Sequence, residues 1–142
     1  MREILFRGKR VDNGEWAYGS LFVENTRCEI VRGTCNDVGI EGVEVDPETV
    51  GQYTGLTDKN GKKIFEGDYA INKIDEGTES EITCIEYVGF MDGSFGFIDH
   101  IVGDLSTKDC FTPFEYCNLY NTVISGNIHD NPKLLKGGVD NV

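Results

Sequence analysis

Three acidic side chains stand at the ends of two neighbouring turns that the sequence predicts between residues 57 and 68. Asp58 begins the first turn, which has Asn60-Gly61 at its tip, and Glu66 and Asp68 flank Gly67 in the second. Carboxylates that converge in this way can bind a divalent cation, and their repulsion can raise the pKa of one of them. The alternative is structural, because Asp side chains in turns accept hydrogen bonds from nearby backbone amides. We favour the structural interpretation and expect no metal site here.

The five cysteines are the other metal-ligating candidates: Cys28, Cys35, Cys84, Cys110 and Cys117. Two pairs, 28/35 and 110/117, are each separated by six residues, which is wider than the spacing of about two to four residues in most zinc motifs. His100 precedes Cys110 by ten residues, so a site uniting Cys110, Cys117 and His100 is the alternative. We expect small, reduced, metal-free thiols and no cofactor.

A nucleophilic mechanism would need a base, and His100 and His129 are the only histidines. No Ser lies in a Gly-x-Ser-x-Gly turn, and the glycines at 51, 55 and 61 do not fit a phosphate-binding or dinucleotide-binding loop. The sequence therefore predicts no catalytic residues and a protein that is not an enzyme.

The charge balance limits the classes of partner. The 142 residues include 13 Lys and Arg against 25 Asp and Glu, a formal net charge of -12. A field of that sign repels phosphate backbones and anionic lipid headgroups. We therefore expect no direct contact with nucleic acid and no membrane binding. The excess charge serves either solubility or an acidic face that meets a basic partner.

The N-terminus lacks the apolar core of a signal peptide, and no apolar run approaches the roughly 18 residues that span a bilayer. These features favour the cytoplasm, where thiols stay reduced. The odd number of cysteines also argues against a complete disulfide framework.

Short β-prone runs separated by Gly-containing turns predict the elements that would position these side chains. The expected strands cover residues 4–7, 16–23, 28–32, 48–54, 63–65, 69–74, 82–88, 94–98 and 118–124. Helical turns are expected within 99–109 and after Pro132. The pattern is typical of a mostly β fold, or of an α+β fold with little helix, in which barrel- or sandwich-like strands are joined by hairpin turns. We expect one domain over residues 1–138, with a lobe boundary near 33–46 if there are two β lobes, and a frayed tail at 139–142.

The second expected strand separates side chains by size. Trp16, Tyr18 and Ser20 alternate with the small residues Ala17 and Gly19, so large aromatic side chains share one face. Exposed aromatic residues are common anchors of protein interfaces. Trp16 and Tyr18 are therefore the candidate interface residues.

Three stretches of the chain together resemble the YopX family of phage and prophage proteins. The N-terminal stretch is residues 4–9 with 16–19, the central stretch is 50–68, and the C-terminal stretch is 124–135. Their order and spacing cover nearly the whole chain, although the segment from about 89 to 117 matches nothing known for the family. The resemblance implies a phage or prophage accessory protein with a largely β fold, and it carries over no activity and no catalytic residues.

The central stretch consists mainly of turn formers and apolar residues, which is more typical of architecture than of chemistry. Its turns set the register of a hairpin, and Tyr53, Leu56, Ile64 and Phe65 are the expected core residues. The C-terminal stretch departs from the family mildly, with His129 and Asp130 where an aromatic residue and a Glu are usual.

These observations favour a non-enzymatic accessory protein that acts in the host cell through protein contacts, as a homo-oligomer or with a host or phage protein. One alternative is an acidic DNA mimic that inhibits a host nucleic-acid-binding protein. The other is a metal-dependent enzyme built on Asp58, Glu66 and Asp68.

Overall fold

The computed structural model describes residues 1–32, 41–102 and 109–136. Strands make up 54% of the described residues and short 3-10 helices 11%, which confirms the mostly β prediction. The strands form two antiparallel sheets that do not close into a barrel. The chain divides into two compact units, Met1–Gly55 and Leu56–Val142. The sequence placed a lobe boundary near 33–46, of which residues 33–40 lie outside the described part, as does the predicted tail at 139–142.

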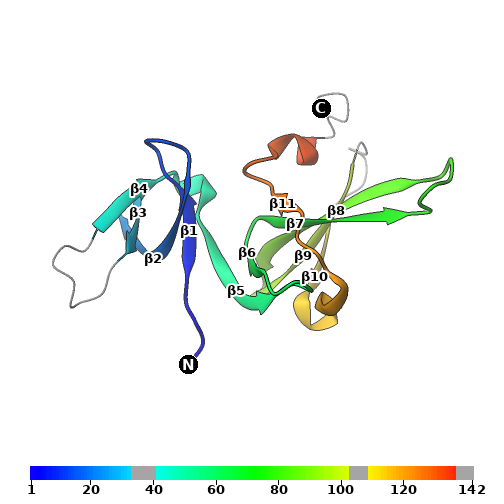
Figure 1. The fold of residues 1–142 in the computed structure, drawn as a ribbon, viewed down its shortest axis with the longest axis horizontal. Helices are drawn as coiled ribbons and strands as arrows, with labels where there is room; N and C mark the ends of the chain where they lie inside the picture. The colour runs from blue at the N-terminus through cyan, green and yellow to red at the C-terminus, as the bar shows by residue number, and fades with distance from the viewer. Residues whose placement is uncertain (33–40, 103–108, 137–142) are drawn as a thin grey trace. The chain divides into compact units, whose positions relative to one another are not determined.

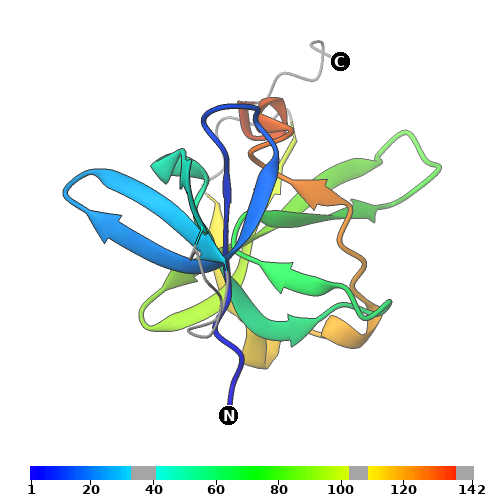
Figure 2. The same ribbon diagram turned by 60° about the vertical axis from the view of Figure 1, so that its left-hand side comes forward.

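The first unit is a meander of antiparallel strands. The strand β1 (Phe6–Lys9) pairs with β2 (Trp16–Glu24), which is followed outwards by β3 (Arg27–Arg32) and β4 (Glu41–Val45) (Figure 1). On the other side of β1 lies β5 (Gly51–Thr57). The paired β2 and β3 are seen clearly as the blue and light-blue hairpin of Figure 2.

Turn chemistry and alternation explain this unit. Gly14 has a φ of 73° in the loop that joins β1 to β2, as the predicted turn at Asn13-Gly14 requires. Along β2, Ala17 is 1% exposed whereas Tyr18 is 45% exposed, which confirms the predicted separation of small and aromatic side chains. The inward face forms a core of Ala17, Cys28, Ile30, Val43 and Val45.

The strand predicted at 48–54 begins later than expected. Asp46 accepts a hydrogen bond from the backbone N–H of Glu48 (3.0 Å), and Pro47 opens the 3-10 helix η1 (Pro47–Thr49). An Asx cap followed by Pro favours a helical turn over an extended chain. The strand β5 therefore starts at Gly51.

The second unit contains the other sheet, in the order β10-β9-β8-β7-β11. The bounds are β7 (Asp68–Ile74), β8 (Ile82–Met91), β9 (Ser94–Ile101), β10 (Cys110–Pro113) and β11 (Gly126–Asn127). The short strand β6 (Lys63–Phe65) follows β5 in the strand order of the first sheet. Residues 99–101, where a helical turn was expected to begin, belong to β9, and residues 103–108 lie outside the described part.

The segment between β10 and β11 crosses one face of this sheet. It contains the 3-10 helices η2 (Phe114–Tyr116) and η3 (Leu119–Asn121), so the prediction of a strand at 118–124 is wrong. The backbone N–H of Thr122 donates to the Leu119 oxygen (3.2 Å) and its hydroxyl to the Asn118 oxygen (3.1 Å), which closes a turn instead. The core beneath consists of Ile64, Val88, Phe97, Phe114 and Ile124. The predicted helical turn at Pro132 is confirmed as η4 (Pro132–Lys136).

Gly61→Val is expected to lower the free energy of unfolding by about 1–2 kcal/mol. Gly61 has a φ of 80°, and a Cβ built there meets nothing within 4 Å, so the whole cost is the left-handed backbone conformation. Urea denaturation followed by circular dichroism measures it. Gly61→Asn is the matched control and should cost less, because Asn tolerates this region. A Val variant that unfolds like the parent would show that the hairpin turn does not set the fold.

Candidate functional site

Asp58 is a structural residue. It is 6% exposed. Its Oδ1 accepts hydrogen bonds from the backbone N–H groups of Asn60 and Lys62 (2.9 Å each), and its Oδ2 accepts one from Ile124 (3.0 Å). Burial works to raise the pKa of Asp58, but the three N–H groups hold it below its usual value. One carboxylate thus closes the turn of the central stretch and ties the C-terminal stretch to it.

Asp68 plays a similar part in the second turn. It is 1% exposed, and its Oδ2 accepts a hydrogen bond from the backbone N–H of Phe65 (2.8 Å). Gly67, which lies between Phe65 and Asp68 in the sequence, has a φ of 89°. No three His, Cys, Asp or Glu side chains are placed to hold a metal ion anywhere in the described residues, so Asp58, Glu66 and Asp68 form no such group. The geometry supports the structural interpretation of this motif.

The C-terminal stretch is also held by its own side chains. Asn127 is 9% exposed, and its Oδ1 accepts hydrogen bonds from the backbone N–H groups of His129 (3.1 Å) and Asp130 (2.9 Å). A Cβ on Gly67 would lie 3.1 Å from the His129 Nε2, so the glycine is needed for close packing as well as for its φ. His129 therefore packs against the turn of the central stretch.

The predicted alternative that unites His100, Cys110 and Cys117 is not formed. Cys110 is opposite Asp99 in the β9–β10 ladder, whereas His100 is opposite Ile85 in the β8–β9 ladder. Because neighbouring residues of a strand point to opposite faces, His100 and Cys110 lie on different faces of the sheet. Within the described residues the His100 Nδ1 pairs with the Asp109 Oδ1 (2.9 Å).

The described cysteines are all free thiols: Cys28, Cys84, Cys110 and Cys117. Burial raises the pKa of Cys84 and of Cys117, and nearby carboxylates add to both shifts. A raised pKa keeps these two side chains as neutral thiols at neutral pH, which is unfavourable for a nucleophile or a metal ligand. Cys35 lies outside the described residues.

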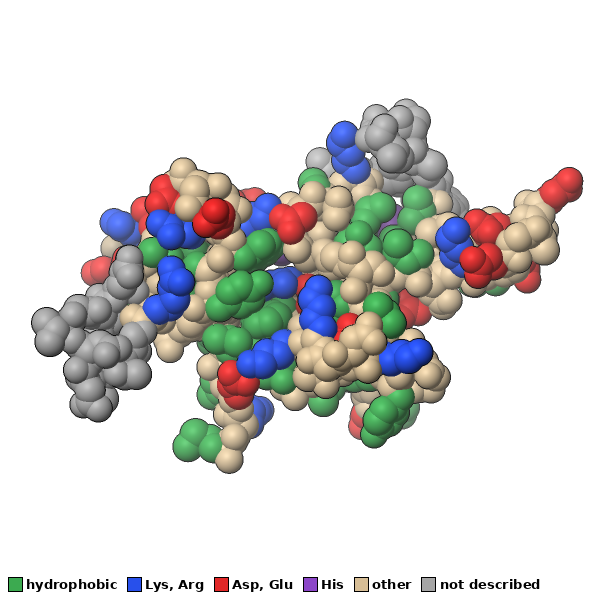
Figure 3. All heavy atoms as spheres, in the orientation of Figure 1, with side chains coloured by type: hydrophobic (Ala, Val, Ile, Leu, Met, Phe, Trp, Pro, Cys, Tyr) green, Lys and Arg blue, Asp and Glu red, His purple; other side chains and the backbone are tan. Residues whose placement is uncertain are grey.

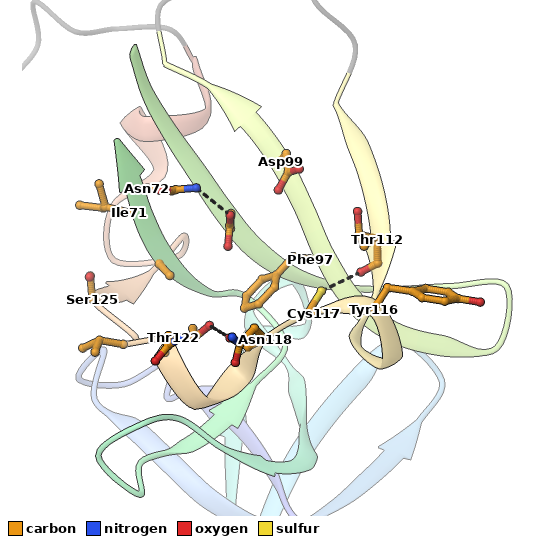
Figure 4. Close-up of a pocket in the computed structure, with 14 residues that line it drawn as sticks. Ile71, Asn72, Phe97, Asp99, Thr112, Tyr116, Cys117, Asn118, Thr122 and Ser125 are labelled. Carbon is orange, nitrogen blue, oxygen red and sulfur yellow. Dashed lines mark hydrogen bonds between the residues drawn. The ribbon is translucent and has the colours of Figure 1, made fainter. Parts of the chain in front are cut away.

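A pocket of about 610 Å³ opens on the face of the second sheet that the η2–η3 segment covers only in part (Figure 4). Val88 and Phe97, opposite each other in the ladder, lie under the segment as core. One step along the same face, Glu86 and Asp99 are also directly opposite each other, and they line the pocket with Asn72. The same sheet face thus changes from an apolar core to an open, acidic pocket.

The two carboxylates of the pocket repel each other. Burial raises the pKa of Glu86 and the charge of Asp99 raises it further, while a hydrogen bond from the Asn72 Nδ2 (3.3 Å) to the Glu86 Oε1 partly offsets the shift. Burial also raises the pKa of Asp99. Asp99 has no hydrogen-bond donor and no cationic partner among the described residues, so its charge is compensated by none of them.

Sequence reasoning missed this pair. Along β8, Glu86 lies on the same face as the buried Cys84 and Val88, because side chains alternate between faces. A charged residue on an otherwise apolar face was therefore the sequence pattern that could have indicated the site. The partner could not be found in this way, because the opposition of Glu86 and Asp99 depends on the register of β8 against β9.

Apolar and aromatic side chains surround the pocket. Tyr116 and Val123 line it, and Tyr120 follows in η3. These three residues, here called the contact rim, are 76%, 44% and 91% exposed for Tyr116, Val123 and Tyr120. Such a group of large exposed side chains beside a concavity is typical of a binding surface.

The predicted interface residues of the first unit have different surroundings. The Trp16 ring is half-buried and makes cation–π contacts with two basic side chains. The Arg7 Cζ lies 4.6 Å and the Lys9 Nζ 5.6 Å from the ring centroid. Tyr18 is 45% exposed, and Phe22, on the same face of β2, is 50% exposed. Tyr18 with Phe22 is therefore the more accessible aromatic pair of this strand.

Replacing both pocket carboxylates, in Glu86→Gln/Asp99→Asn, is expected to raise the free energy of unfolding at pH 7 by about 0.2–1 kcal/mol, since like charges directly opposite each other destabilise a sheet. An acid whose pKa is raised by folding destabilises the fold above that pKa, and the penalty disappears as the pH falls to the ordinary pKa values of 3.8 and 4.5. The advantage of the variant over the parent should therefore shrink between pH 7 and pH 4. Urea midpoints at several pH values measure it, and an advantage that grows on acidification would contradict the assignment.

A comparison with protein-family models decides the family, since the model of the YopX protein family matches residues 5–136. The chain belongs to the YopX family. The match spans both units and includes the three stretches that carry the resemblance, except for residue 4. A search of curated proteins gives no match.

Among solved structures, this YopX-family chain is similar to the crystal structure of protein EF1440 from Enterococcus faecalis. The TM-score is 0.55 at 21% sequence identity, over 95% of this chain and 99% of that chain. The similarity confirms the fold over nearly the full length of both proteins. No helix among the described residues is long and apolar enough to cross a membrane.

Proposed function

We propose that this YopX-family chain is a non-enzymatic phage or prophage accessory protein that acts in the host cytoplasm by contacting other proteins. The observation that carries the proposal is the contact rim, because Tyr116 lines the pocket and is largely exposed, and Tyr120, four residues later in the same segment, is also largely exposed. Tyr is enriched in the energetically dominant centres of protein interfaces. The free thiols fit a reducing compartment.

The rim and the pocket together have the anatomy of an interface centre. The rim supplies apolar area that a partner would remove from water, at about 25 cal/mol per Å². The pocket supplies a concavity in which a partner's side chain would be desolvated and held. Anchoring residues are most effective in such well-packed pockets.

The test compares tagged parent with Tyr116→Ser/Tyr120→Ser in cross-linking and capture from infected host cells. We expect at least one protein to be cross-linked to the parent and lost from the variant, while the melting temperatures agree because both side chains are exposed. Phe90→Ser is the matched control for an exposed aromatic residue outside the rim, since Phe90 is 52% exposed and does not line the pocket. A parent and a rim variant that capture the same proteins in the same amounts would contradict the proposal.

Self-association is the second part of the proposed function, and it is assigned to the first unit. Tyr18 and Phe22 present aromatic side chains on one face of β2, with Ser20 between them, and a second copy would cover both. Light scattering coupled to size-exclusion chromatography should give a mass above that of the monomer for the parent and the monomer mass for Tyr18→Ser/Phe22→Ser. A monomeric parent at high concentration would refute self-association.

The charge distribution favours protein contacts over the alternative of an acidic DNA mimic. A mimic needs an uninterrupted array of acidic side chains. On the face seen in Figure 3, Lys and Arg side chains lie among the Asp and Glu side chains. The metal-dependent alternative is also less favoured, since Asp58 and Asp68 use carboxylate oxygens to accept backbone hydrogen bonds.

A further inference from the structure

The polar floor of the pocket differs chemically from its rim, and it defines what would bind there. Its two half-buried carboxylates, Glu86 and Asp99, come from directly opposite positions of β8 and β9. We propose that the pocket binds the guanidinium group of an arginine side chain that a partner protein inserts between Glu86 and Asp99. The inference rests on the proposed function only in that the arginine belongs to a contacted protein.

The spacing of the floor fits one guanidinium group. Opposite residues of an antiparallel pair have their Cβ atoms about 4.5–5.5 Å apart, so Glu86 and Asp99 present their oxygens from neighbouring positions. A guanidinium carries five N–H donors in a rigid planar fork, which matches carboxylate geometry. One such group can therefore donate to both side chains at once.

Within the described part of the chain, the charge of Asp99 is not compensated, and a bound cation would neutralise it. Asp99 has no donor and no cationic partner among the described residues, and Glu86 has one amide donor from Asn72. Two like charges on opposite positions cost stability unless something neutralises them. Binding of a cation removes the repulsion, so the arrangement favours the occupied pocket over the empty one.

Other cations fit less well. A metal ion would need more ligands than two carboxylates, and the described residues offer no group of three His, Cys, Asp or Glu. A lysine ammonium is a compact, strongly hydrated point charge, without the planar fork that bridges two acceptors. Arginine is also the basic residue that is enriched at interface centres.

Nα-acetyl-L-arginine amide, titrated into the full-length protein and followed by two-dimensional amide NMR, tests the site directly. We expect saturable shifts confined to the strands that carry Asn72, Glu86 and Asp99. Nα-acetyl-L-citrulline amide is the neutral isostere and should produce none. Glu86→Gln/Asp99→Asn should bind the arginine amide at least tenfold more weakly, whereas Glu115→Gln, an exposed carboxylate that does not line the pocket, should bind like the parent. Equal shifts with citrulline, no saturable shifts, or unchanged binding by the double variant would overturn the proposal.

A second arm identifies the source of the guanidinium. The peptide Nα-acetyl-Leu-Arg-Leu-amide should bind at least fivefold more tightly than the arginine amide, because its leucines contact the rim. Tyr116→Ser/Tyr120→Ser should abolish that gain and leave arginine-amide binding intact. If the peptide and the amide bind equally, the ligand is a small guanidinium compound and the assignment to a partner protein is wrong. Because these titrations use no partner, failure of the capture experiment would leave their outcome unaffected.

Discussion

Asp58→Ala is expected to lower the free energy of unfolding by about 3–5 kcal/mol. The substitution removes the acceptor of three backbone N–H groups, those of Asn60, Lys62 and Ile124. A hydrogen bond to a charged group contributes roughly 1.5–3 kcal/mol, and donors left buried without a partner add a penalty. The three contributions are not additive, because some of these donors will find water. Urea denaturation followed by circular dichroism measures the loss.

Two further variants make this prediction specific. Asp58→Asn should cost less than Ala, because its amide oxygen can still accept from Asn60 and Lys62 while its amide nitrogen faces the N–H of Ile124. Asp12→Ala is the matched control, since Asp12 is exposed in a loop and pairs with Arg10 (2.7 Å); its midpoint should hardly move. An Asp58→Ala protein as stable as the Asp12→Ala protein would refute the structural role of Asp58.

Asp68→Asn is expected to lower the free energy of unfolding by about 1.5–3 kcal/mol, although it replaces only one carboxylate oxygen by an amide nitrogen. Asp68 is 1% exposed and accepts the backbone N–H of Phe65 at 2.8 Å, and a neutral amide is the weaker acceptor. A catalytic role would give the opposite result, namely an unchanged melting temperature with a lost activity. Differential scanning calorimetry of the parent and variant distinguishes the two, and equal melting temperatures would contradict the structural assignment.

Asp58 and the pocket pair Glu86 and Asp99 have opposite pH behaviour. For Asp58, hydrogen bonds hold the pKa down in spite of burial; its stabilising contribution is therefore present above the ordinary pKa of 3.8 and is lost as the pH falls. For Glu86 and Asp99, burial raises the pKa, so acidification removes a penalty. The same chemical group thus stabilises the fold in the shared stretches and destabilises it in the pocket.

Local signals were sufficient to predict most of the second unit. Lys63–Phe65 forms β6 at the predicted residues, and positive φ values occur at Gly61 and Gly67 where turns were expected. These elements are determined by residues that are close together in the sequence, so a single sequence is enough to predict them. The error at 118–124 has a different origin: the residues are β-prone, but Phe114 and Ile124 anchor the segment across the sheet in the core and η3 forms between them.

The pocket could not be predicted from the sequence, because it depends on which strand residues lie opposite each other. Glu86 and Asp99 meet because of the strand register, and the η2–η3 segment leaves them uncovered. Phe97, Asp99 and Tyr116 also lie between residues 89 and 117, the part of the chain to which the family resemblance assigns nothing. The shared stretches supply turns and buried hydrogen bonds, and this segment supplies several of the pocket and rim residues. We therefore propose that the shared stretches build the scaffold and that the pocket performs recognition.

One measurement tests this division most directly, namely the urea midpoints at pH 7 of four single variants that each replace a carboxylate by its amide: Asp58→Asn, Asp68→Asn, Glu86→Gln and Asp99→Asn. The account predicts lower midpoints than the parent for Asp58→Asn and Asp68→Asn. It predicts equal or higher midpoints for Glu86→Gln and Asp99→Asn, because their charges cost stability in the free protein. Midpoints that fall for the pocket pair, or that stay unchanged for Asp58 and Asp68, would contradict it.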